Sequence, residues 1–355
     1  MFFKAYSVSS VFTGSVLKRI INPAAMASNH RLLKLLTCGL FVSTIIVFSF
    51  FYGWDVPNIL REYRTQQVHE DRQKQRKQLI KEVCDSNREK YMEIPLREDY
   101  WKTFLVDDNY RIIYCFVPKV ACTNWKRFMY MLKHDQLSVD PNNITDDVHA
   151  VTALNYLWKF PKEEIEAKLK NYTKFMFVRD PFVRVISAYR NKFEWITQKY
   201  YLKYGREMLQ RYGNWSNPPE TAEELLAIDK RVTFDNFVQY LVDPRSEENR
   251  FFDEHWRQAY RMCHPCVVQY DFIGHLENLE EDTKQLFELL HLQNDMKIAD
   301  AFPNVTTTSV LLEWFRTVSQ EDRRKLYKLY EPDFKLFGYR KPEELFETED
   351  QDRAL

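Results

Sequence analysis

The sequence predicts a globular domain that alternates strands and helices, placed behind a single membrane-spanning helix. Hydrophobic residues make up 45% of the 355 residues and aromatic residues 15%, enough to fill the core of an enzyme-sized domain. One long uncharged segment lies near the N-terminus. Two later segments each have the pattern of a buried strand followed at once by an amphipathic helix.

The composition excludes several classes of binding site. Only 7 glycines are present, and neither the G-x-G-x-x-G dinucleotide motif nor the G-x-x-x-x-G-K-[ST] phosphate loop occurs. The 51 Lys and Arg residues balance 51 Asp and Glu residues, so the net charge gives no support for a nucleic-acid partner. Any basic binding site must therefore be local.

The uncharged segment, residues 35–54, is long enough to cross the hydrocarbon core of a membrane as one helix. Basic residues but no acidic ones precede it, and Asp55 follows it directly. The positive-inside rule therefore predicts a cytosolic tail over residues 1–34, a signal anchor over 35–54 and a lumenal remainder. A cleaved signal peptide and a mitochondrial presequence are the alternatives.

The lumenal part is expected to have three sections. Residues 55–90 are polar and predict a helical or loose stem, for which a solvated linker is the simpler interpretation. The globular domain is expected over residues 91–346, and a polar tail over 347–355. N-glycans are expected at some of the four N-x-[ST] sequons, which are at Asn143, Asn171, Asn214 and Asn304.

Five cysteines follow the anchor, so at least one must be free or form an intermolecular bridge. Cys263 and Cys266 have the spacing of half a zinc site, but the chain has no second C-x-x-C motif to complete it. A disulfide that involves one or both of them is the favoured interpretation. The sequence leaves the pairing open, and it predicts no metal site.

The first strand-to-helix unit begins with the apolar run 111–117, which predicts a buried strand. The helix that follows has one apolar face, formed at i, i+3, i+4 and i+7 by Trp125, Phe128, Met129 and Leu132. Between them lies a segment that predicts a phosphate-binding turn built without glycine: Pro118, Lys119, Val120, Ala121, Cys122, Thr123 and Asn124. The free N–H groups and the positive dipole end of a helix favour an anion there, although an ordinary turn is the alternative.

The second unit repeats this design. Residues 174–178 predict a strand, Asp180 an N-cap and Pro181 the first helical position. One face of the helix is apolar, with Phe182, Val185, Ile186, Tyr189 and Phe193, and the other carries Arg184, Ser187 and Asn191. With Arg179 at the strand end, this polar stripe suits a second phosphate, and a solvated face is the alternative.

The segments VPKVACTNWKR at 117–127 and FVRDPFVRVISAYRNKFE at 177–194 resemble the paired nucleotide motifs of Golgi carbohydrate sulfotransferases. Within that group the chain resembles the chondroitin 4-O-sulfotransferases, through further blocks at 252–266, 270–282 and 326–339. The resemblance implies a P-loop-NTPase-like α/β sulfotransferase domain with a central parallel sheet. It also implies a single-pass type II Golgi membrane protein that uses 3′-phosphoadenosine 5′-phosphosulfate as donor and requires no metal.

The resemblance assigns roles to both turns. Pro118 to Asn124 would bind the 5′-phosphosulfate, with Lys119 beside the oxygen that bridges phosphate to sulfur. Arg179 and Ser187 would bind the 3′-phosphate. The segment between them belongs to the same donor site: Asp180, Pro181, Phe182, Val183, Arg184, Val185 and Ile186. Arg184 would contact either the donor or a neighbouring carboxylate.

The acceptor hydroxyl must lose its proton, and in the wider sulfotransferase group a histidine or a glutamate accepts it. His149 is the favoured candidate, with His255 and Glu254 as alternatives, and either histidine could instead be structural. The implied acceptor is an anionic glycosaminoglycan, chondroitin, which requires a local basic groove. Its expected sources are Arg190, Lys192, Lys199, Lys203, Arg206, Arg250, Arg257 and Arg261.

Two other classes of protein compete with this interpretation. Many Golgi glycosyltransferases share the one-span topology but hold a metal with a D-x-D motif, which occurs here only at 350–352 in the polar tail. A lumenal protein without catalytic activity would have no need of Lys119, Arg179 and Ser187. Dermatan and terminal N-acetylgalactosamine on glycoprotein glycans remain open as acceptors.

Overall fold

The computed structural model describes residues 39–44, 55–88, 91, 98–248, 250–292 and 308–346. The chain divides into two compact units, Met1–Glu70 and Asp71–Leu355, and the division falls inside helix α2 (Asp55–Ser86). Within the described ranges, no helix is both long and apolar enough to cross a membrane. The predicted anchor lies outside the described residues except for 39–44, which are helical and exposed, and both predicted tails lie wholly outside them.

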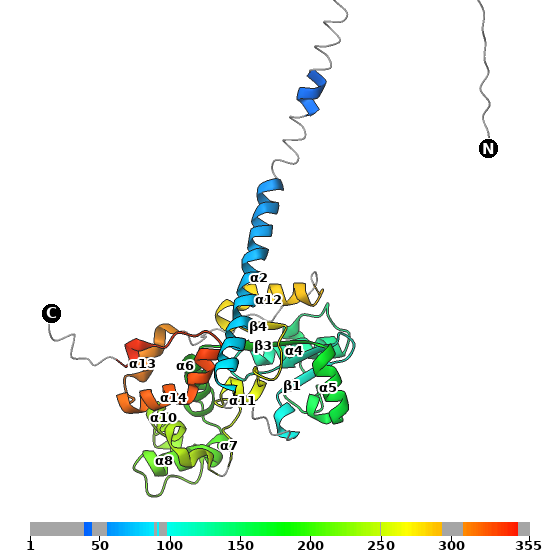
Figure 1. The fold of residues 1–355 in the computed structure, drawn as a ribbon. Helices are drawn as coiled ribbons and strands as arrows, with labels where there is room; N and C mark the ends of the chain where they lie inside the picture. The colour runs from blue at the N-terminus through cyan, green and yellow to red at the C-terminus, as the bar shows by residue number, and fades with distance from the viewer. Residues whose placement is uncertain are drawn as a thin grey trace, which may run out of the picture. The chain divides into compact units, whose positions relative to one another are not determined.

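The larger unit contains a four-stranded sheet and the helices around it (Figure 1). The strands are β1 (Phe104–Asp107), β2 (Ile112–Cys115), β3 (Thr173–Val178) and β4 (Phe272–His275). The helices that follow α2 are α4 (Cys122–Lys133), α5 (Lys162–Asn171), α6 (Pro181–Tyr189), α7 (Gln198–Tyr200), α8 (Arg206–Tyr212), α9 (Ala222–Ala227), α10 (Phe234–Val242), α11 (Ala259–Cys263), α12 (Leu279–Leu289), α13 (Leu311–Phe315) and α14 (Gln320–Leu336).

The sheet is mixed, which corrects the parallel sheet that the resemblance implied. Strands β2, β3 and β4 are parallel, but β1 pairs antiparallel with β2 at the edge of the sheet. Only residues 108–111 join β1 to β2, and a connection this short permits antiparallel pairing alone, because parallel neighbours need a crossover of a dozen or more residues. The two strands predicted from sequence are confirmed as β2 and β3.

Helices α4 and α12 cover one face of the sheet. Trp125 of α4 stacks on Phe177 of β3 with ring centroids 4.4 Å apart, and it meets Phe287 of α12 edge-on at 6.3 Å. The predicted apolar face of α4 is confirmed, since its four members are at most 2% exposed. This packing fixes the start of α4 at the carboxyl end of β2.

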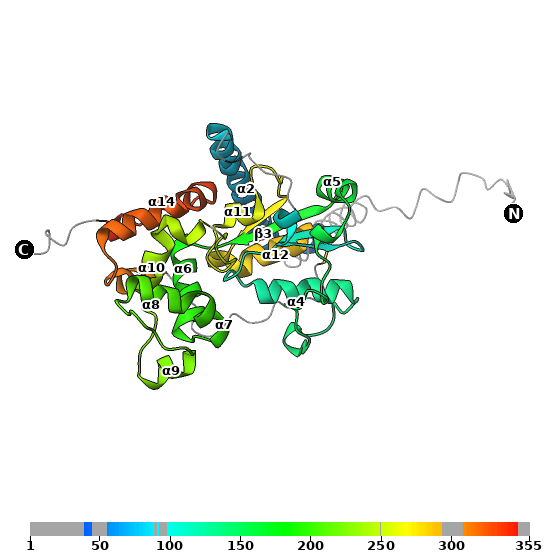
Figure 2. The ribbon, with the colours of Figure 1, turned by 90° about the horizontal axis from the view of Figure 1, so that it is seen from below.

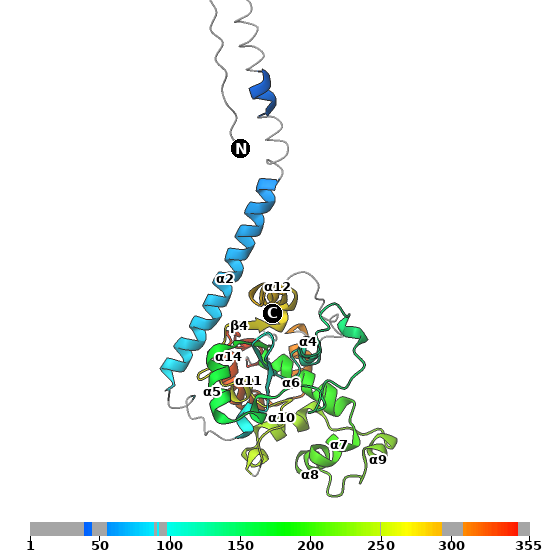
Figure 3. The same ribbon diagram turned by 90° about the vertical axis from the view of Figure 1, so that its right-hand side faces the viewer.

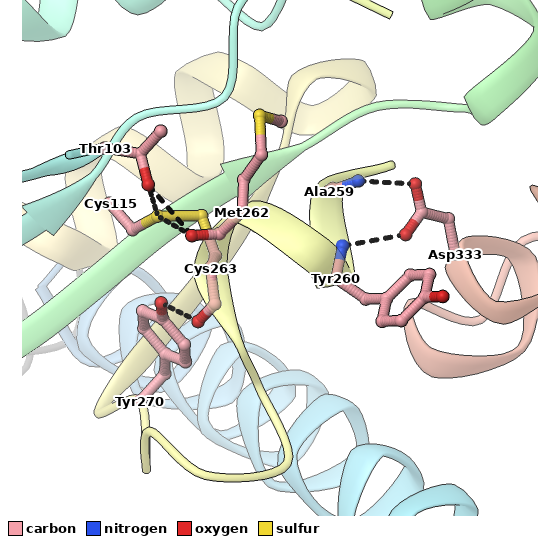
Figure 4. The surroundings of a disulfide bond; sticks show 8 residues. All are labelled: Thr103, Cys115, Ala259, Tyr260, Met262, Cys263, Tyr270 and Asp333. Carbon is pink, nitrogen blue, oxygen red and sulfur yellow. Dashed lines mark hydrogen bonds between the residues drawn. A yellow bond between two sulfur atoms is a disulfide. The ribbon is translucent and has the colours of Figure 1, made fainter. Parts of the chain in front are cut away.

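Two disulfides join the sheet and helix α2 to the segment around α11. Cys115 of β2 is bonded to Cys263 of α11 (Figure 4), and Cys84 of α2 is bonded to Cys266. The predicted disulfide is confirmed, and both cysteines of the C-x-x-C motif take part, each in a different bond. Oxidised cysteines cannot ligate a metal as thiolates, so the zinc alternative loses its ligands. Cys122 keeps a free thiol.

The second half of α2 packs against the open edge of β4 (Figure 3). Gln73 hydrogen-bonds the backbone of Ile273, and Arg76 pairs with the buried carboxylate of Asp282 at 2.8 Å. The sequence set the start of the globular domain at residue 91, whereas the compact unit begins at Asp71. The last 16 residues of the helix expected to be a stem, 71–86, are therefore part of the domain.

A second group of helices, α6, α8, α10, α13 and α14, lies beside the sheet (Figure 2). Its core contains Phe182, and it places Phe193, Tyr204 and Phe237 around the fully buried indole of Trp256. The apolar face predicted for α6 is confirmed by this burial. The carboxylate of Asp333 in α14 accepts hydrogen bonds from the first two N–H groups of α11 and fixes that helix between the two cores (Figure 4).

Candidate active site

The turn between β2 and α4 has an unusual backbone. Lys119 and Ala121 have positive φ angles of 71° and 52°, a conformation that costs a residue with a side chain about 1–2 kcal/mol. A left-handed residue beside an ordinary one directs successive N–H groups toward one side, which forms a concave anion-binding surface. No side chain caps the start of α4. This backbone suits the anion-binding turn without glycine that the sequence predicts.

Positive charges gather around this turn. Burial lowers the pKa of Lys119 to about 8, and repulsion from Lys192, Arg179 and Arg184 adds to the decrease. Four cationic side chains thus share one partly desolvated region. A bound anion would relieve this repulsion, so the charge distribution favours a ligand such as a phosphate or a sulfate ester.

The turn between β3 and α6 is closed by its own side chain. The carboxylate of Asp180 accepts hydrogen bonds from the N–H groups of Phe182 and Val183, both at 2.9 Å, and Pro181 occupies the first helical position. The predicted N-cap is confirmed. Because the cap already occupies these N–H groups, an anion at this turn would depend on the side chains of Arg179 and Ser187.

Arg179 also links the two turns, since its guanidinium donates to the carbonyl of Lys119 at 3.0 Å. It is 7% exposed, and burial lowers its pKa. Ser187 lies two helical turns further along α6 and is half-buried. Arg179 therefore supports the backbone of the first turn in addition to any contact with an anion.

Arg184 is 1% exposed and donates to three backbone carbonyls. The acceptors are Pro118 at 2.9 Å, Glu254 at 2.9 Å and Arg257 at 2.7 Å. The sequence left Arg184 between a donor contact and a carboxylate partner, but in the structure its guanidinium joins the first turn to the segment 254–257. It acts as a clamp between chain segments more than a hundred residues apart.

His149 has a partner at each ring nitrogen. Its Nε2 lies 3.1 Å from the hydroxyl oxygen of Thr123, and its Nδ1 lies 3.5 Å from the ammonium of Lys126. Burial and repulsion from Lys126 lower the pKa of His149. The sequence-predicted loop histidine thus contacts the first helical turn of α4.

His255 pairs with a carboxylate on the same short turn. Its Nδ1 lies 2.6 Å from Oδ1 of Asp253 and 3.4 Å from the hydroxyl of Tyr200. Burial lowers the pKa of His255, although Asp253 opposes that shift. Repulsion from His255 also contributes to the lowered pKa of His149.

Comparison with known proteins identifies the family. Residues 102–340 match the model of the sulfotransferase family, a range that includes both turns, His149 and His255. The chain belongs to the sulfotransferase family. No solved structure matches it.

Three relatives illustrate how far this sulfotransferase chain resembles curated proteins. It is 45% identical over 254 residues to carbohydrate sulfotransferase 12 of Mus musculus, which covers 68% of this chain and 61% of the relative. It is 39% identical to carbohydrate sulfotransferase 11 of Mus musculus, covering 68% of each chain, and 32% identical to carbohydrate sulfotransferase 8 of Homo sapiens, covering 76% and 63%. The match to the first of these relatives thus spans about three fifths of that protein's length.

Membership of the sulfotransferase family weighs against the two competing classes. The D-x-D segment that a glycosyltransferase would use for its metal, 350–352, lies outside the described residues. Within the parts of the chain that the structure describes, no three His, Cys, Asp or Glu side chains form a group able to hold a metal ion.

Lys126, which the sequence patterns did not indicate, contacts the candidate base His149. It is 4% exposed, its ammonium lies 4.0 Å from the ring centre of Phe116, and burial lowers its pKa. The available signal was its spacing: Thr123 and Lys126 are three residues apart on a helix and therefore share a face.

Lys192, whose charge acts on Lys119, lies in a π-helical turn over Arg190–Glu194 that directly follows α6. A π-helical turn changes which side chains share a face of the helix. Its ammonium lies 4.4 Å from the ring centre of Tyr200.

The basic residues expected to bind the acceptor differ in their partners. Four arginines and one lysine are paired with acidic side chains: Arg190 with Glu194, Lys203 with Asp253, Arg206 with Glu220, Arg250 with Glu207, and Arg261 with Glu247. Arg257 donates to the carbonyl of Phe252. Lys192 and Lys199 form no ion pair with a described acidic residue, so these two offer the least compensated charge.

Proposed function

We propose that this chain transfers sulfate from 3′-phosphoadenosine 5′-phosphosulfate to position 4 of N-acetylgalactosamine in chondroitin. Dermatan, and terminal N-acetylgalactosamine on glycoprotein glycans, are the other acceptors of the same chemistry. The observation that carries the proposal is the turn at Lys119. There an uncapped helix end, a left-handed backbone and a cluster of cations meet in a chain of the sulfotransferase family.

The donor would be held by both strand-to-helix turns. Pro118 to Asn124 would hold the 5′-phosphosulfate through backbone N–H groups and the hydroxyl of Thr123. Arg179 and Ser187 would hold the 3′-phosphate, with the segment 180–186 forming the wall between them. Asp180 caps α6 and Arg184 binds the carbonyl of Pro118, so these two residues would position the turns without contacting the donor. When bound, the donor supplies the sulfuryl group.

Lys119 would act on the oxygen that leaves with the 5′-phosphate. Negative charge grows on that oxygen during transfer, so an ammonium beside it stabilises the transition state more than the ground state. The lowered pKa of Lys119 means that the ammonium is incompletely compensated before the donor binds. His149, His255 and Glu254 are the candidates for the base that deprotonates the acceptor.

An anionic acceptor would enter over the surface that carries Lys192 and Lys199. Chondroitin has one carboxylate in each disaccharide, and uncompensated lysines beside the donor site would attract it. The names of the relatives, carbohydrate sulfotransferases 12, 11 and 8, favour a carbohydrate acceptor.

We further propose that the chain is a single-pass type II Golgi membrane protein with a lumenal catalytic domain. The support is the uncharged segment 35–54 and the basic tail before it. Of the sequon asparagines, Asn143, Asn171 and Asn214 are exposed, as glycosylation requires, and Asn304 lies outside the described residues. Loss of mass after glycosidase treatment and protection from protease in intact Golgi vesicles would test this proposal.

The activity can be tested with a radiolabelled sulfate donor and a panel of unsulfated acceptors. Desulfated chondroitin, desulfated dermatan and a glycan ending in N-acetylgalactosamine should be compared, and the products digested to disaccharides. We expect label on position 4 of N-acetylgalactosamine in chondroitin. Label on position 6 or on the uronic acid would overturn the acceptor assignment and leave the donor site in place.

A further inference from the structure

We propose that His255 is the base that takes the proton of the acceptor hydroxyl, and that Asp253 positions its ring. This inference rests on the sulfate transfer proposed above. It reverses the order of preference that the sequence suggested, in which His149 came first. Three observations carry it: the hydrogen bonds of the two histidines, the clamp formed by Arg184, and the charges that face His255.

The geometry fixes the tautomer of His255. Asp253 remains a carboxylate, because hydrogen bonds from His255 and the charge of Lys203 hold its pKa at about 2 despite burial. A carboxylate only accepts hydrogen bonds, so the contact of 2.6 Å requires that Nδ1 of His255 carries the proton. Nε2 then has a free lone pair, and no described residue hydrogen-bonds to it. This is the arrangement that a general base requires.

Asp253 is itself held in place from two sides. Its Oδ1 also accepts the backbone N–H of His255 at 3.2 Å, and its Oδ2 accepts the hydroxyl of Tyr204 at 3.2 Å. The carboxylate and the imidazole are therefore locked on one turn, which lowers the entropy lost in orienting the base.

Arg184 sets the distance between His255 and the donor turn. One guanidinium binds the carbonyl of Pro118, directly before Lys119, and the carbonyl of Glu254, directly before His255. Lys119, which would stabilise the leaving oxygen, and His255, which would deprotonate the acceptor, thus each directly follow a residue whose carbonyl binds Arg184.

His149 lacks a free lone pair in the same structure. An ammonium has no lone pair to accept with, so Lys126 can only donate to Nδ1, and the proton of neutral His149 must then be on Nε2. That N–H donates to the hydroxyl of Thr123 at 3.1 Å. His149 is therefore suited to orient Thr123 toward the donor. Glu254 is the remaining candidate, but no described residue orients its carboxylate.

Sulfate transfer at this site breaks two bonds and forms two. The O–H bond of the acceptor breaks and its proton goes to Nε2 of His255, while the acceptor oxygen forms a bond to sulfur. The bond from sulfur to the 5′-phosphate oxygen breaks, and its electron pair stays on that oxygen beside the ammonium of Lys119. The products are a sulfate ester, adenosine 3′,5′-bisphosphate and a protonated His255, which returns its proton to solvent.

The test compares His255→Gln, Asp253→Asn and His149→Gln, with the exposed His134→Gln as the matched control. Calorimetry with adenosine 3′,5′-bisphosphate first establishes that each variant folds and binds the donor product. We expect His255→Gln to lower kcat about 10²–10⁴-fold with this affinity kept, in the range typical of general bases. Asp253→Asn should lower kcat at least tenfold with the acceptor KM unchanged. His149→Gln should chiefly raise the donor KM.

A second readout does not depend on turnover. The pKa of His255, followed by NMR of the ring, should fall in Asp253→Asn, because the carboxylate that favours the imidazolium loses its charge. Lys192, Glu254, Tyr200 and His149 also interact with the ring, and Asp253→Asn leaves all four unchanged. The acid limb of the kcat profile should move to lower pH by the same amount.

Wild-type kcat in His255→Gln, or an unchanged pKa of His255 in Asp253→Asn, would overturn the inference and leave sulfate transfer intact. Loss of turnover in His149→Gln alone, with donor affinity kept, would give the role to His149. A wild-type protein that binds the bisphosphate but transfers no sulfate would instead overturn the proposed function.

Discussion

The side-chain amide of Gln73 pairs with both backbone groups of Ile273, accepting from the N–H at 3.1 Å and donating to the carbonyl at 3.0 Å. Ile273 lies in β4, the edge strand of the sheet, whose outer N–H and C=O groups would otherwise be open to another chain. One glutamine of α2 thus takes the place of a neighbouring strand. Arg76 adds a second hydrogen bond to the same carbonyl at 2.8 Å.

This pairing predicts how far the N-terminus of an expressed fragment can be shortened. A fragment that begins at residue 71 should be secreted as well as one that begins at residue 55. A fragment that begins at residue 91 loses Gln73, Arg76 and the Cys84–Cys266 disulfide, whose removal typically costs about 2–5 kcal/mol. Secretion yield and thermal unfolding measure the effect. Equal yield and stability for the two shorter fragments would show that α2 is dispensable.

Lys119→Ala should lower turnover by two or more orders of magnitude while the fragment folds and is secreted normally. The reason is that its ammonium would act mainly in the transition state. Turnover at saturating donor and the affinity for adenosine 3′,5′-bisphosphate should be measured together. Weak donor binding with full turnover at saturation would reduce Lys119 to a binding role.

Ser187→Ala should raise the donor KM with little change in kcat. The 3′-phosphate is remote from sulfur and is held equally in the ground state and the transition state. Inhibition by adenosine 3′,5′-bisphosphate should weaken, and inhibition by adenosine 5′-phosphate should not. Arg179→Ala should weaken both inhibitors, because Arg179 also holds the carbonyl of Lys119 in the first turn. Equal losses for both inhibitors in Ser187→Ala would contradict the assignment.

Activity should survive EDTA, since the proposed transfer uses lysine, helix N–H groups and a histidine where a D-x-D glycosyltransferase would use a divalent ion. The measurement is sulfate transfer before and after chelation. Complete loss that added Mn²⁺ or Mg²⁺ restores would revive the metal-dependent alternative. A small stimulation would not, because divalent ions screen an anionic polymer.

His275 should make the fold less stable in mild acid. Burial and the charges of Arg76 and Arg72 lower its pKa to about 3, from 6.5. Below pH 6.5 the unfolded chain therefore binds a proton at His275 that the folded chain does not bind. The free energy of unfolding has its full value above pH 6.5 and decreases as the pH falls below it. His275→Phe keeps the ring that stacks on Tyr339 and removes the titration.

At pH 5 the titration of His275 lowers the free energy of unfolding by at most about 2 kcal/mol. The comparison must be made between wild type and His275→Phe, because Asp180 and Asp333 have pKa values raised to about 6 and act in the opposite direction. Denaturant unfolding at pH 7 and pH 5 should show a smaller decrease for the variant. If the free energy of unfolding decreased equally in wild type and His275→Phe, His275 would be protonated in the folded state as well.

Much of the donor site could be predicted from sequence because its signals are local. The apolar run before Pro118 and the spacing of Trp125 and Phe128 identify a strand and the buried face of a helix. Asp180 followed by Pro181 identifies the start of the next helix to the residue. Each signal depends on backbone geometry within a few residues, which short-range sterics and hydrogen bonding determine.

The sequence by itself therefore determined the two strand-to-helix turns, the polar residues on them and the family to which they belong. Only the tertiary structure decided which of those residues meet: the clamp of Arg184 spans 66 to 73 residues, and Gln73 meets Ile273 across 200. It also decided that β1 runs antiparallel and that Nε2 of His255 has no hydrogen-bond partner among the described residues, whereas both ring nitrogens of His149 have one. Such contacts form when buried apolar faces pack together and every enclosed polar group must find a partner, and no local pattern specifies that partner.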